Sequence, residues 1–154
     1  MELQPAIKPD QAARVIRDAS RKALKSYLTM CQLDSPWEVP ESFLATEAAK
    51  ALAHQQKQRV AIEFKVNRTG EHPTSEKQSI LPERLRGDAH LDVAILKQAK
   101  NGQHYTFQVD GIIEFKKQAS LEGDANLISF MIENGRARFG VLVLFVVGNT
   151  PDDV

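Results

Sequence analysis

Apolar residues recur at helical spacing in three stretches of the chain and predict three helices. The first covers residues 9–31, where apolar positions three and four residues apart share one face and basic residues occupy the other. A proline-containing break at 35–40 precedes a second helix at about 41–56. The third helix is predicted at 125–134, between a Gly-Asp pair suited to capping and Gly135, which suits a helix stop.

Four apolar, β-branched runs predict strands between and after these helices. Residues 59–66 alternate apolar and polar positions, as half-buried strands do. The runs at 88–96 and 112–117 flank Lys100-Asn101-Gly102-Gln103, which favours a hairpin. The last run, 139–147, is typical of a fully buried strand, parallel to the 112–117 strand through a helical crossover. The pattern predicts an α/β protein with a mixed sheet.

The hairpin turn sets which residues of the two central strands share a face. A two-residue Asn-Gly loop would put Asp92 and Glu114 on opposite faces, whereas a three-residue loop shifts the pairing by one. Because a one-residue slip exchanges the faces of a strand, burial of the apolar odd-numbered positions should select the second register. The even-numbered residues of 88–96 are then expected to share a face with Glu114 and Lys116, through an extra residue at the turn or a bulge near Gly111.

Several carboxylates would meet on that shared face. The second register puts Asp88 opposite Glu114 and Asp92 opposite Asp110. Facing carboxylates repel each other, and a bound divalent cation would remove this penalty. Two carboxylates and a lysine on paired strands can hold such a cation and stabilise a phosphoryl transition state. The pattern therefore predicts a metal-dependent nuclease.

The order of these residues along the chain is that of a known motif. Asp92 directly precedes the apolar run Val93-Ala94-Ile95-Leu96, and Glu114-Phe115-Lys116 lies on the next strand. An aspartate that begins an apolar strand, followed by Glu-x-Lys, resembles the PD-(D/E)XK, or restriction-endonuclease-like, superfamily. The motif's proline is absent, and Asp88 is a second candidate for the family aspartate. Glu-x-Lys also occurs at Glu63-Phe64-Lys65, so this tripeptide alone has little specificity.

The resemblance covers about residues 40–148 and implies a fold. The expected fold is a restriction-endonuclease-like αβββαβ core, with a mixed β-sheet flanked by helices. An extra N-terminal helix at 9–31 would precede the core, and residues 1–154 would form one domain.

The resemblance also assigns roles to residues. Asp92, Glu114 and Lys116 would be catalytic, and Mg²⁺ or Mn²⁺ would be held by Asp92 or Asp88, by Glu114 and by the main-chain carbonyl of Phe115. Lys116 would orient or help to deprotonate the attacking water and stabilise charge on the phosphate. Four further polar residues are candidates for additional site positions: Glu47, Glu63, Asp110 and Gln118.

The function that follows is hydrolysis of phosphodiester bonds in nucleic acid, with DNA preferred over RNA as the expected substrate. The alternative is a catalytically inactive protein of the nuclease fold that serves as a binding or assembly subunit. A third interpretation is an unrelated α/β domain whose carboxylates pair with Arg84, Arg86 and Lys116. A homodimer stays open in each case.

The composition agrees with a small globular protein and argues against several other classes of protein. The 154 residues are 42% hydrophobic, and 20 basic residues balance 20 acidic ones, so no global field attracts nucleic acid. The single cysteine, Cys31, offers neither a disulfide framework nor a zinc cluster. No signal peptide and no run long enough to cross a bilayer is evident, so we expect a cytoplasmic protein without a membrane partner. No Gly-x-Ser-x-Gly elbow or P-loop is present.

Overall fold

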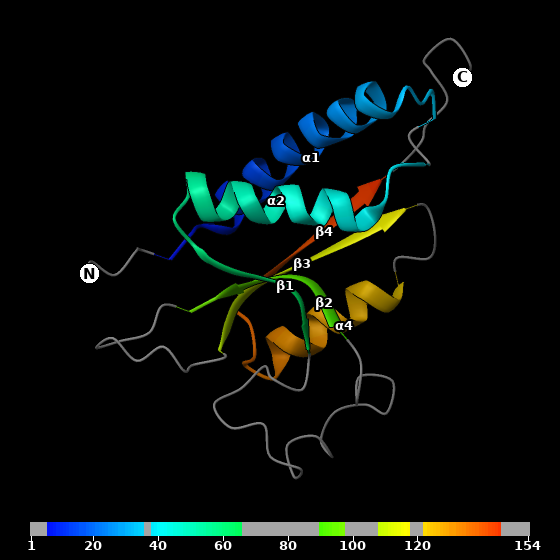
Figure 1. The fold of residues 1–154 in the computed structure, drawn as a ribbon. Helices are drawn as coiled ribbons and strands as arrows, with labels where there is room; N and C mark the ends of the chain where they lie inside the picture. The colour runs from blue at the N-terminus through cyan, green and yellow to red at the C-terminus, as the bar shows by residue number, and fades with distance from the viewer. Residues whose placement is uncertain (1–5, 36–37, 66–89, 98–107, 118–121, 146–154) are drawn as a thin grey trace.

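Three helices and four strands make up the part of the chain that the computed structural model describes, residues 6–35, 38–65, 90–97, 108–117 and 122–145 (Figure 1). The elements, in chain order, are α1 (Pro9–Cys31), α2 (Glu41–Gln55), β1 (Arg59–Lys65), β2 (His90–Leu96), β3 (Val109–Lys117), α4 (Glu122–Glu133) and β4 (Phe139–Phe145). From α2 onward this is the αβββαβ order expected from the sequence, with one helix before it.

The helix bounds follow local signals at both ends. Helix α1 starts at a proline, which is tolerated in the first turn, and is capped after Cys31 by Gln32, which adopts a left-handed conformation with φ 53°. Both α1 and α2 match their predicted ranges to within one residue. Helix α4 begins at Glu122, so the prediction that it starts at 125 is wrong, and Asp124 lies inside the first turn. Gly135, at φ 65°, provides the predicted stop.

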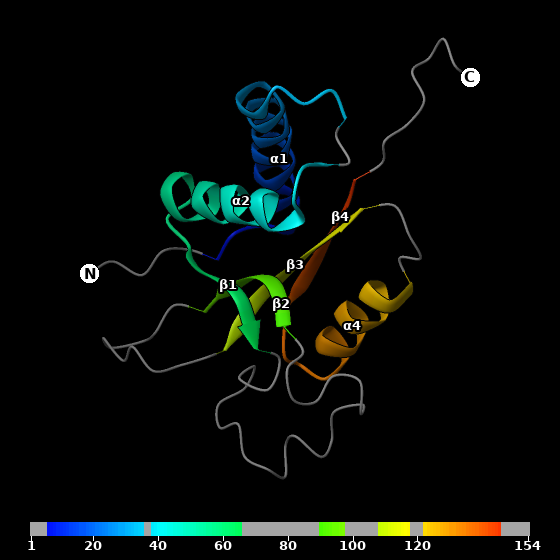
Figure 2. The ribbon, with the colours of Figure 1, turned by 45° about the vertical axis from the view of Figure 1, so that its right-hand side comes forward.

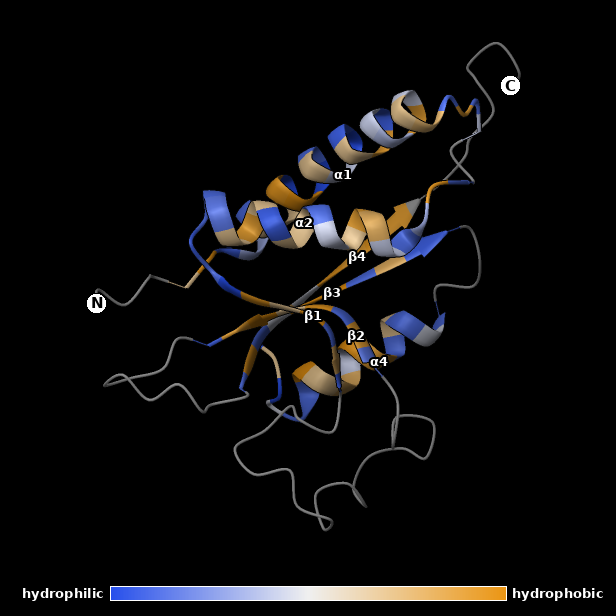
Figure 3. Ribbon diagram, in the orientation of Figure 1, coloured by the Kyte–Doolittle hydropathy of each residue, from blue (hydrophilic) through white to orange (hydrophobic). Residues whose placement is uncertain are grey.

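A four-stranded sheet in the order β1-β2-β3-β4 forms the centre of the fold. Strands β1, β2 and β3 are antiparallel neighbours, and β4 is parallel to β3, as the crossover through α4 predicts. Helices α1 and α2 cover one face and α4 covers the other (Figures 1 and 2). Apolar residues are concentrated on the strands, whereas hydrophilic residues recur along α1 (Figure 3).

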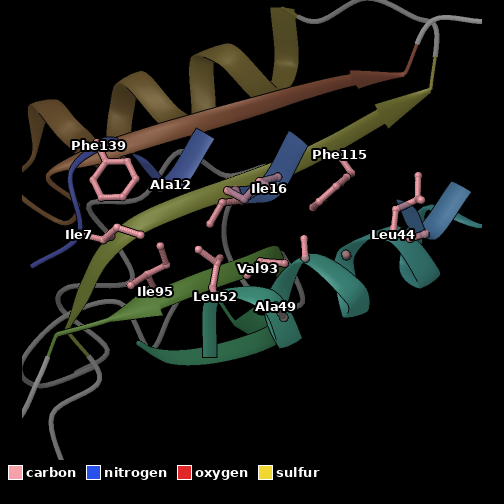
Figure 4. Close-up of a cluster of buried hydrophobic side chains, with 14 of the residues drawn as sticks. Ile7, Ala12, Ile16, Leu44, Ala49, Leu52, Val93, Ile95, Phe115 and Phe139 are labelled. Carbon is pink, nitrogen blue, oxygen red and sulfur yellow. The ribbon is translucent and has the colours of Figure 1, made fainter. Parts of the chain in front are cut away.

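The core has two parts, one on each side of the sheet. Beneath α1 and α2, the odd-numbered residues Val93, Ile95, Ile113 and Phe115 pack against side chains of both helices (Figure 4). On the α4 side, even-numbered strand residues such as Ala94 and Ile112 pack against α4. The sheet therefore buries both faces.

The register between β2 and β3 contains the expected bulge. Val93 pairs with Ile113 and Ile95 with Gly111, but Leu96 then pairs with Val109, which leaves Asp110 as the extra residue. The bulge near Gly111, one of the two predicted routes to this register, is observed, and the predicted shared face of Asp92, Glu114 and Lys116 is confirmed.

Two details of the predicted register are wrong. Continuing the observed pairs puts Asp92 level with Glu114, whereas the sequence analysis placed it opposite Asp110 and placed Asp88 opposite Glu114. Burial dictates the parity of a register, but which residues meet also depends on the turn and on the bulge at Asp110. The turn lies outside the described residues, as does Asp88. The bulge also turns Asp110 to the α1 side and Val109 to the α4 side, so Val109 leaves the predicted odd-numbered apolar face.

Gly111 permits a close approach that another residue would prevent. A Cβ atom at this position would lie 2.5 Å from Cζ of Phe139, whose ring belongs to the core beneath α1. We expect Gly111→Ala to lower the free energy of unfolding by about 1–3 kcal/mol through overpacking, as measured by urea titration. The matched control is Gly123→Ala in α4, where a Cβ meets open space and a helix former replaces glycine. Equal effects of the two variants would contradict this account.

Candidate functional site

Strands β2 and β3 stop pairing at Asp92 and Glu114. Their last backbone pair is Val93 with Ile113. At the next position the backbone N–H of Phe115 donates to Asp92 Oδ2 at 2.8 Å, and the backbone N–H of Asp92 donates to Glu114 Oε1 at 3.4 Å. Two carboxyl groups thus replace the hydrogen-bond ladder where the strands separate, and the structure brings together the two acidic residues of the predicted motif.

A bend in β1 lies beside this point. Glu63 falls between the pairs Ile62–Val93 and Phe64–Leu91, and it has φ 51°, which is uncommon for a residue with a side chain. Strands β1 and β2 curve together toward the α4 side of the sheet (Figure 2). The bend moves Leu91 into the cluster beneath α4, so its predicted place on the odd-numbered face is wrong. Backbone strain of this kind is often found at functional sites.

The two carboxyl groups have altered acidity. Glu114 is only 5% exposed, and burial, followed by the negative charge of Asp92, raises its pKa to about 9. Burial also raises the pKa of Asp92, although the N–H of Phe115 opposes this change. At neutral pH Glu114 therefore keeps its proton, which it shares with Asp92 through a hydrogen bond. The second negative charge becomes stable only if a cation compensates it.

Two further acidic residues lie close enough to influence this pair. Asp124, in the first turn of α4, forms an ion pair with Lys116, with 3.7 Å between Nζ and Oδ2, and its charge helps to raise the pKa of both Asp92 and Glu114. Glu41, the first residue of α2, accepts a hydrogen bond from the N–H of Lys117 at 2.9 Å and also raises the pKa of Asp92.

The sequence analysis missed both of these residues. Each is an acidic residue in the first turn of a helix, where it favours the helix dipole, and this common pattern did not distinguish them from other surface carboxylates. Their adjacency to the motif depends on how α2 and α4 pack against the sheet.

Of the remaining predicted residues, two lie away from this pair and one lies at the neighbouring bend of β1. Glu47 forms an ion pair with Lys50 on the same helix and lines a hollow between α1 and α2. Asp110 binds Arg138 through both oxygens, at 2.9 and 3.0 Å, on the other side of the sheet from Glu114. Glu63 is exposed at the bend of β1. Asp88 and Gln118 lie outside the described residues.

The donor set at Asp92 and Glu114 suits a hard divalent cation. Mg²⁺ is usually held by one or two carboxylates, with waters and substrate phosphate completing its coordination. Within the described ranges no three histidine, cysteine, aspartate or glutamate residues are grouped so as to hold a metal ion. A site here would therefore rest on two carboxylates with solvent or substrate ligands. The predicted role of the Phe115 carbonyl stays a prediction.

Comparisons with protein-family models, with curated proteins and with solved structures found no match. In the described part of the chain, no helix is both long enough and apolar enough to cross a membrane.

Proposed function

We propose that this protein is a metal-dependent nuclease of the restriction-endonuclease-like fold, acting on DNA or RNA. The observation that carries the proposal is the meeting of Asp92 and Glu114 at the point where β2 and β3 separate, with Lys116 two residues further along β3. Supporting it are the αβββαβ order of elements and a buried carboxyl pair that retains a proton in the absence of a cation. Perturbed acid groups of this kind cluster at functional sites.

Asp92, Glu114 and Lys116 would have different roles in the proposed cleavage reaction. Asp92 and Glu114 would hold Mg²⁺ or Mn²⁺, which when bound supplies charge stabilisation at the phosphate and a more acidic water. Glu114 must release its proton to become a ligand, so cation binding should strengthen as the pH rises toward 9. Lys116 would orient the attacking water and stabilise the developing charge on the phosphate.

The ion pair between Lys116 and Asp124 is compatible with this role. Its 3.7 Å separation and the partial exposure of both side chains make it a weak interaction, typically below about 1 kcal/mol. A substrate phosphate can therefore replace Asp124 as the partner of Lys116 without a large free-energy penalty.

The same contacts favour one alternative, an inactive protein of this fold that serves as a binding or assembly subunit. Lys116 already has a partner in Asp124, and Glu114 is neutral and hydrogen bonded to Asp92. The three motif residues are thus satisfied without a cation, as structural residues would be.

Cation-dependent stability and cleavage separate the two possibilities. We expect MgCl₂ or MnCl₂ to raise the melting temperature of the wild type and of Lys116→Ala, because a ligand that binds the folded state stabilises it. Asp92→Asn should lose this response. Cleavage of a labelled DNA duplex should fall by about 100-fold or more in Lys116→Ala, on the scale of losing one transition-state donor.

The chain supplies a matched control for the lysine. Lys65 ends the second Glu-x-Lys tripeptide and is exposed at the end of β1, so Lys65→Ala should keep full activity. An unchanged cation response in Asp92→Asn, together with its loss in Asp88→Asn, would transfer the ligand role to Asp88. No cation response and no cleavage in the wild type would support the inactive alternative.

A further inference from the structure

Strand β4 ends the sheet with an unprotected edge. Within the described residues it pairs with β3 alone, and its other edge has no neighbouring strand. Its sequence, Phe-Gly-Val-Leu-Val-Leu-Phe, has no charge and no proline, the features that usually keep an edge from pairing with another chain. Leu144 on this strand is 42% exposed. The edge is therefore a template for one more strand.

A hollow of about 350 Å³ runs along this edge, between β4 and α1. Strand residues 141–144 form its apolar side, and α1 contributes Ala13, Arg17, Ser20, Arg21 and Leu24. None of the described residues that line it is acidic. The hollow thus combines an apolar strand with two positive charges.

One polar group in this hollow has no partner. Ser20 is 6% exposed, and its Oγ forms no hydrogen bond with the described residues. Buried hydroxyl groups are nearly always hydrogen bonded, so an unpaired one asks for an explanation. Ser20 lines the hollow, so a change of its side-chain rotamer would present the hydroxyl group to a ligand oxygen there, which would provide the missing acceptor.

The charges beside Ser20 indicate which ligand oxygen fits. The ion pair of Arg17 within the described residues is with the adjacent Asp18, at 3.4 Å between Nε and Oδ1 on the exposed surface, which is a weak interaction. Arg21 forms no ion pair within the described part of the chain and is exposed. Two guanidinium groups and a hydroxyl donor are complementary to a carboxylate.

We propose that the β4 edge and this hollow bind an extended segment of a partner protein that carries an acidic side chain. The segment would add a strand to the sheet, as in other cases of strand addition. Its backbone would pair with the free edge of β4, and its carboxylate would enter the hollow between Ser20, Arg17 and Arg21. This surface is separate from the carboxyl pair at Asp92, so the inference is independent of the nuclease proposal.

Two other occupants fit less well. A second copy of the chain, pairing antiparallel through β4, would bring both copies of Arg17 and Arg21 to the same side of the joined sheet, where they repel. A nucleic acid could contact the arginines, but phosphate groups only accept hydrogen bonds and cannot satisfy the outward carbonyl groups of an edge strand. An acidic strand satisfies both the backbone and the charges.

Fluorescence anisotropy with a labelled, end-blocked peptide, Ser-Val-Thr-Val-Glu-Val-Thr-Val-Ser, tests the charge requirement. The wild type should bind it about tenfold or more tightly than the same peptide with Lys in place of Glu, which corresponds to one charged hydrogen bond. The double variant Arg17→Glu/Arg21→Glu should reverse this preference, and Ser20→Ala should weaken binding of the Glu peptide. Equal affinity for the two peptides, or no binding, would overturn the proposal.

Peptides methylated on alternate backbone nitrogens test the pairing without altering the protein. Successive amides of an added strand point to opposite edges, and only one edge faces β4. One peptide is therefore methylated on the odd-numbered amides and the other on the even-numbered amides, and only one of the two should lose binding. Equal behaviour of the two peptides would contradict strand addition.

Sedimentation of the wild type as a dimer that Leu144→Lys dissociates would assign the edge to a second copy. Displacement of the peptide by a single-stranded oligonucleotide would assign it to nucleic acid. Either result would overturn the proposal.

Discussion

Glutamine in place of Glu114 is expected to stabilise the cation-free protein at about pH 8 by a few kcal/mol and to abolish cleavage. The folded protein holds the Glu114 proton up to about pH 9, whereas the unfolded chain releases it near the ordinary pKa of 4.5. The stabilisation from this proton is therefore complete below pH 4.5 and is lost progressively as the pH rises through 9. Glutamine does not titrate, and its amide can donate to Asp92 as the protonated acid does.

The pH dependence of unfolding gives a direct measurement. Urea titrations of the wild type in EDTA should show a declining free energy of unfolding between about pH 5 and 9, and Glu114→Gln should remove most of this slope. Glu47→Gln on α2 is the control. Glu47 forms an ion pair with Lys50 on its own helix and is not among the charges that shift the pKa of Asp92 or Glu114. If Glu114→Gln keeps the wild-type slope, the buried acid is not the source of it. If it loses several kcal/mol at every pH, Glu114 is a structural residue.

Asp110→Ala is expected to lower the free energy of unfolding by about 2–3 kcal/mol, in contrast to Asp92→Asn, which should be neutral or stabilising without a cation. Asp110 is buried and holds Arg138 through two hydrogen bonds, and the same guanidinium group donates to the carbonyl of Ile7 at 2.6 Å. Removing the carboxylate leaves the guanidinium group without its counter-ion and weakens the link between β3, β4 and the segment before α1. Arg138 is 42% exposed, which keeps the loss moderate.

The comparison of the two aspartates tests the distinction between a structural and a functional carboxylate. Asp92→Asn keeps an oxygen for the N–H of Phe115 and removes a negative charge that raises the pKa of Glu114. In EDTA, the melting temperature and the free energy of unfolding in urea should both fall for Asp110→Ala and should stay equal or rise for Asp92→Asn. Cleavage should be lost only in Asp92→Asn. Similar destabilisation by both would mean that Asp92 is part of the structural framework.

Local patterns in the sequence were enough to predict the elements and the two motif residues that meet. Helical spacing places α1 and α2, and apolar runs place the four strands, because burial of a regular face has a period that a single chain reveals. The same logic predicts that Asp92 and Glu114 share a face, since a slip by one residue would expose every apolar side chain of β2.

Packing between distant segments supplied the rest. The bulge at Asp110 turns one carboxylate away from Glu114 and toward Arg138, although the sequence pattern alone treats Asp110 and Asp92 alike. Glu41 and Asp124 approach the pair only because α2 and α4 dock against the sheet from opposite sides. Periodicity determines which face a residue occupies, whereas its position along that face depends on turns and on helix packing. Those depend on contacts between residues far apart in the chain, and a single sequence does not reveal them.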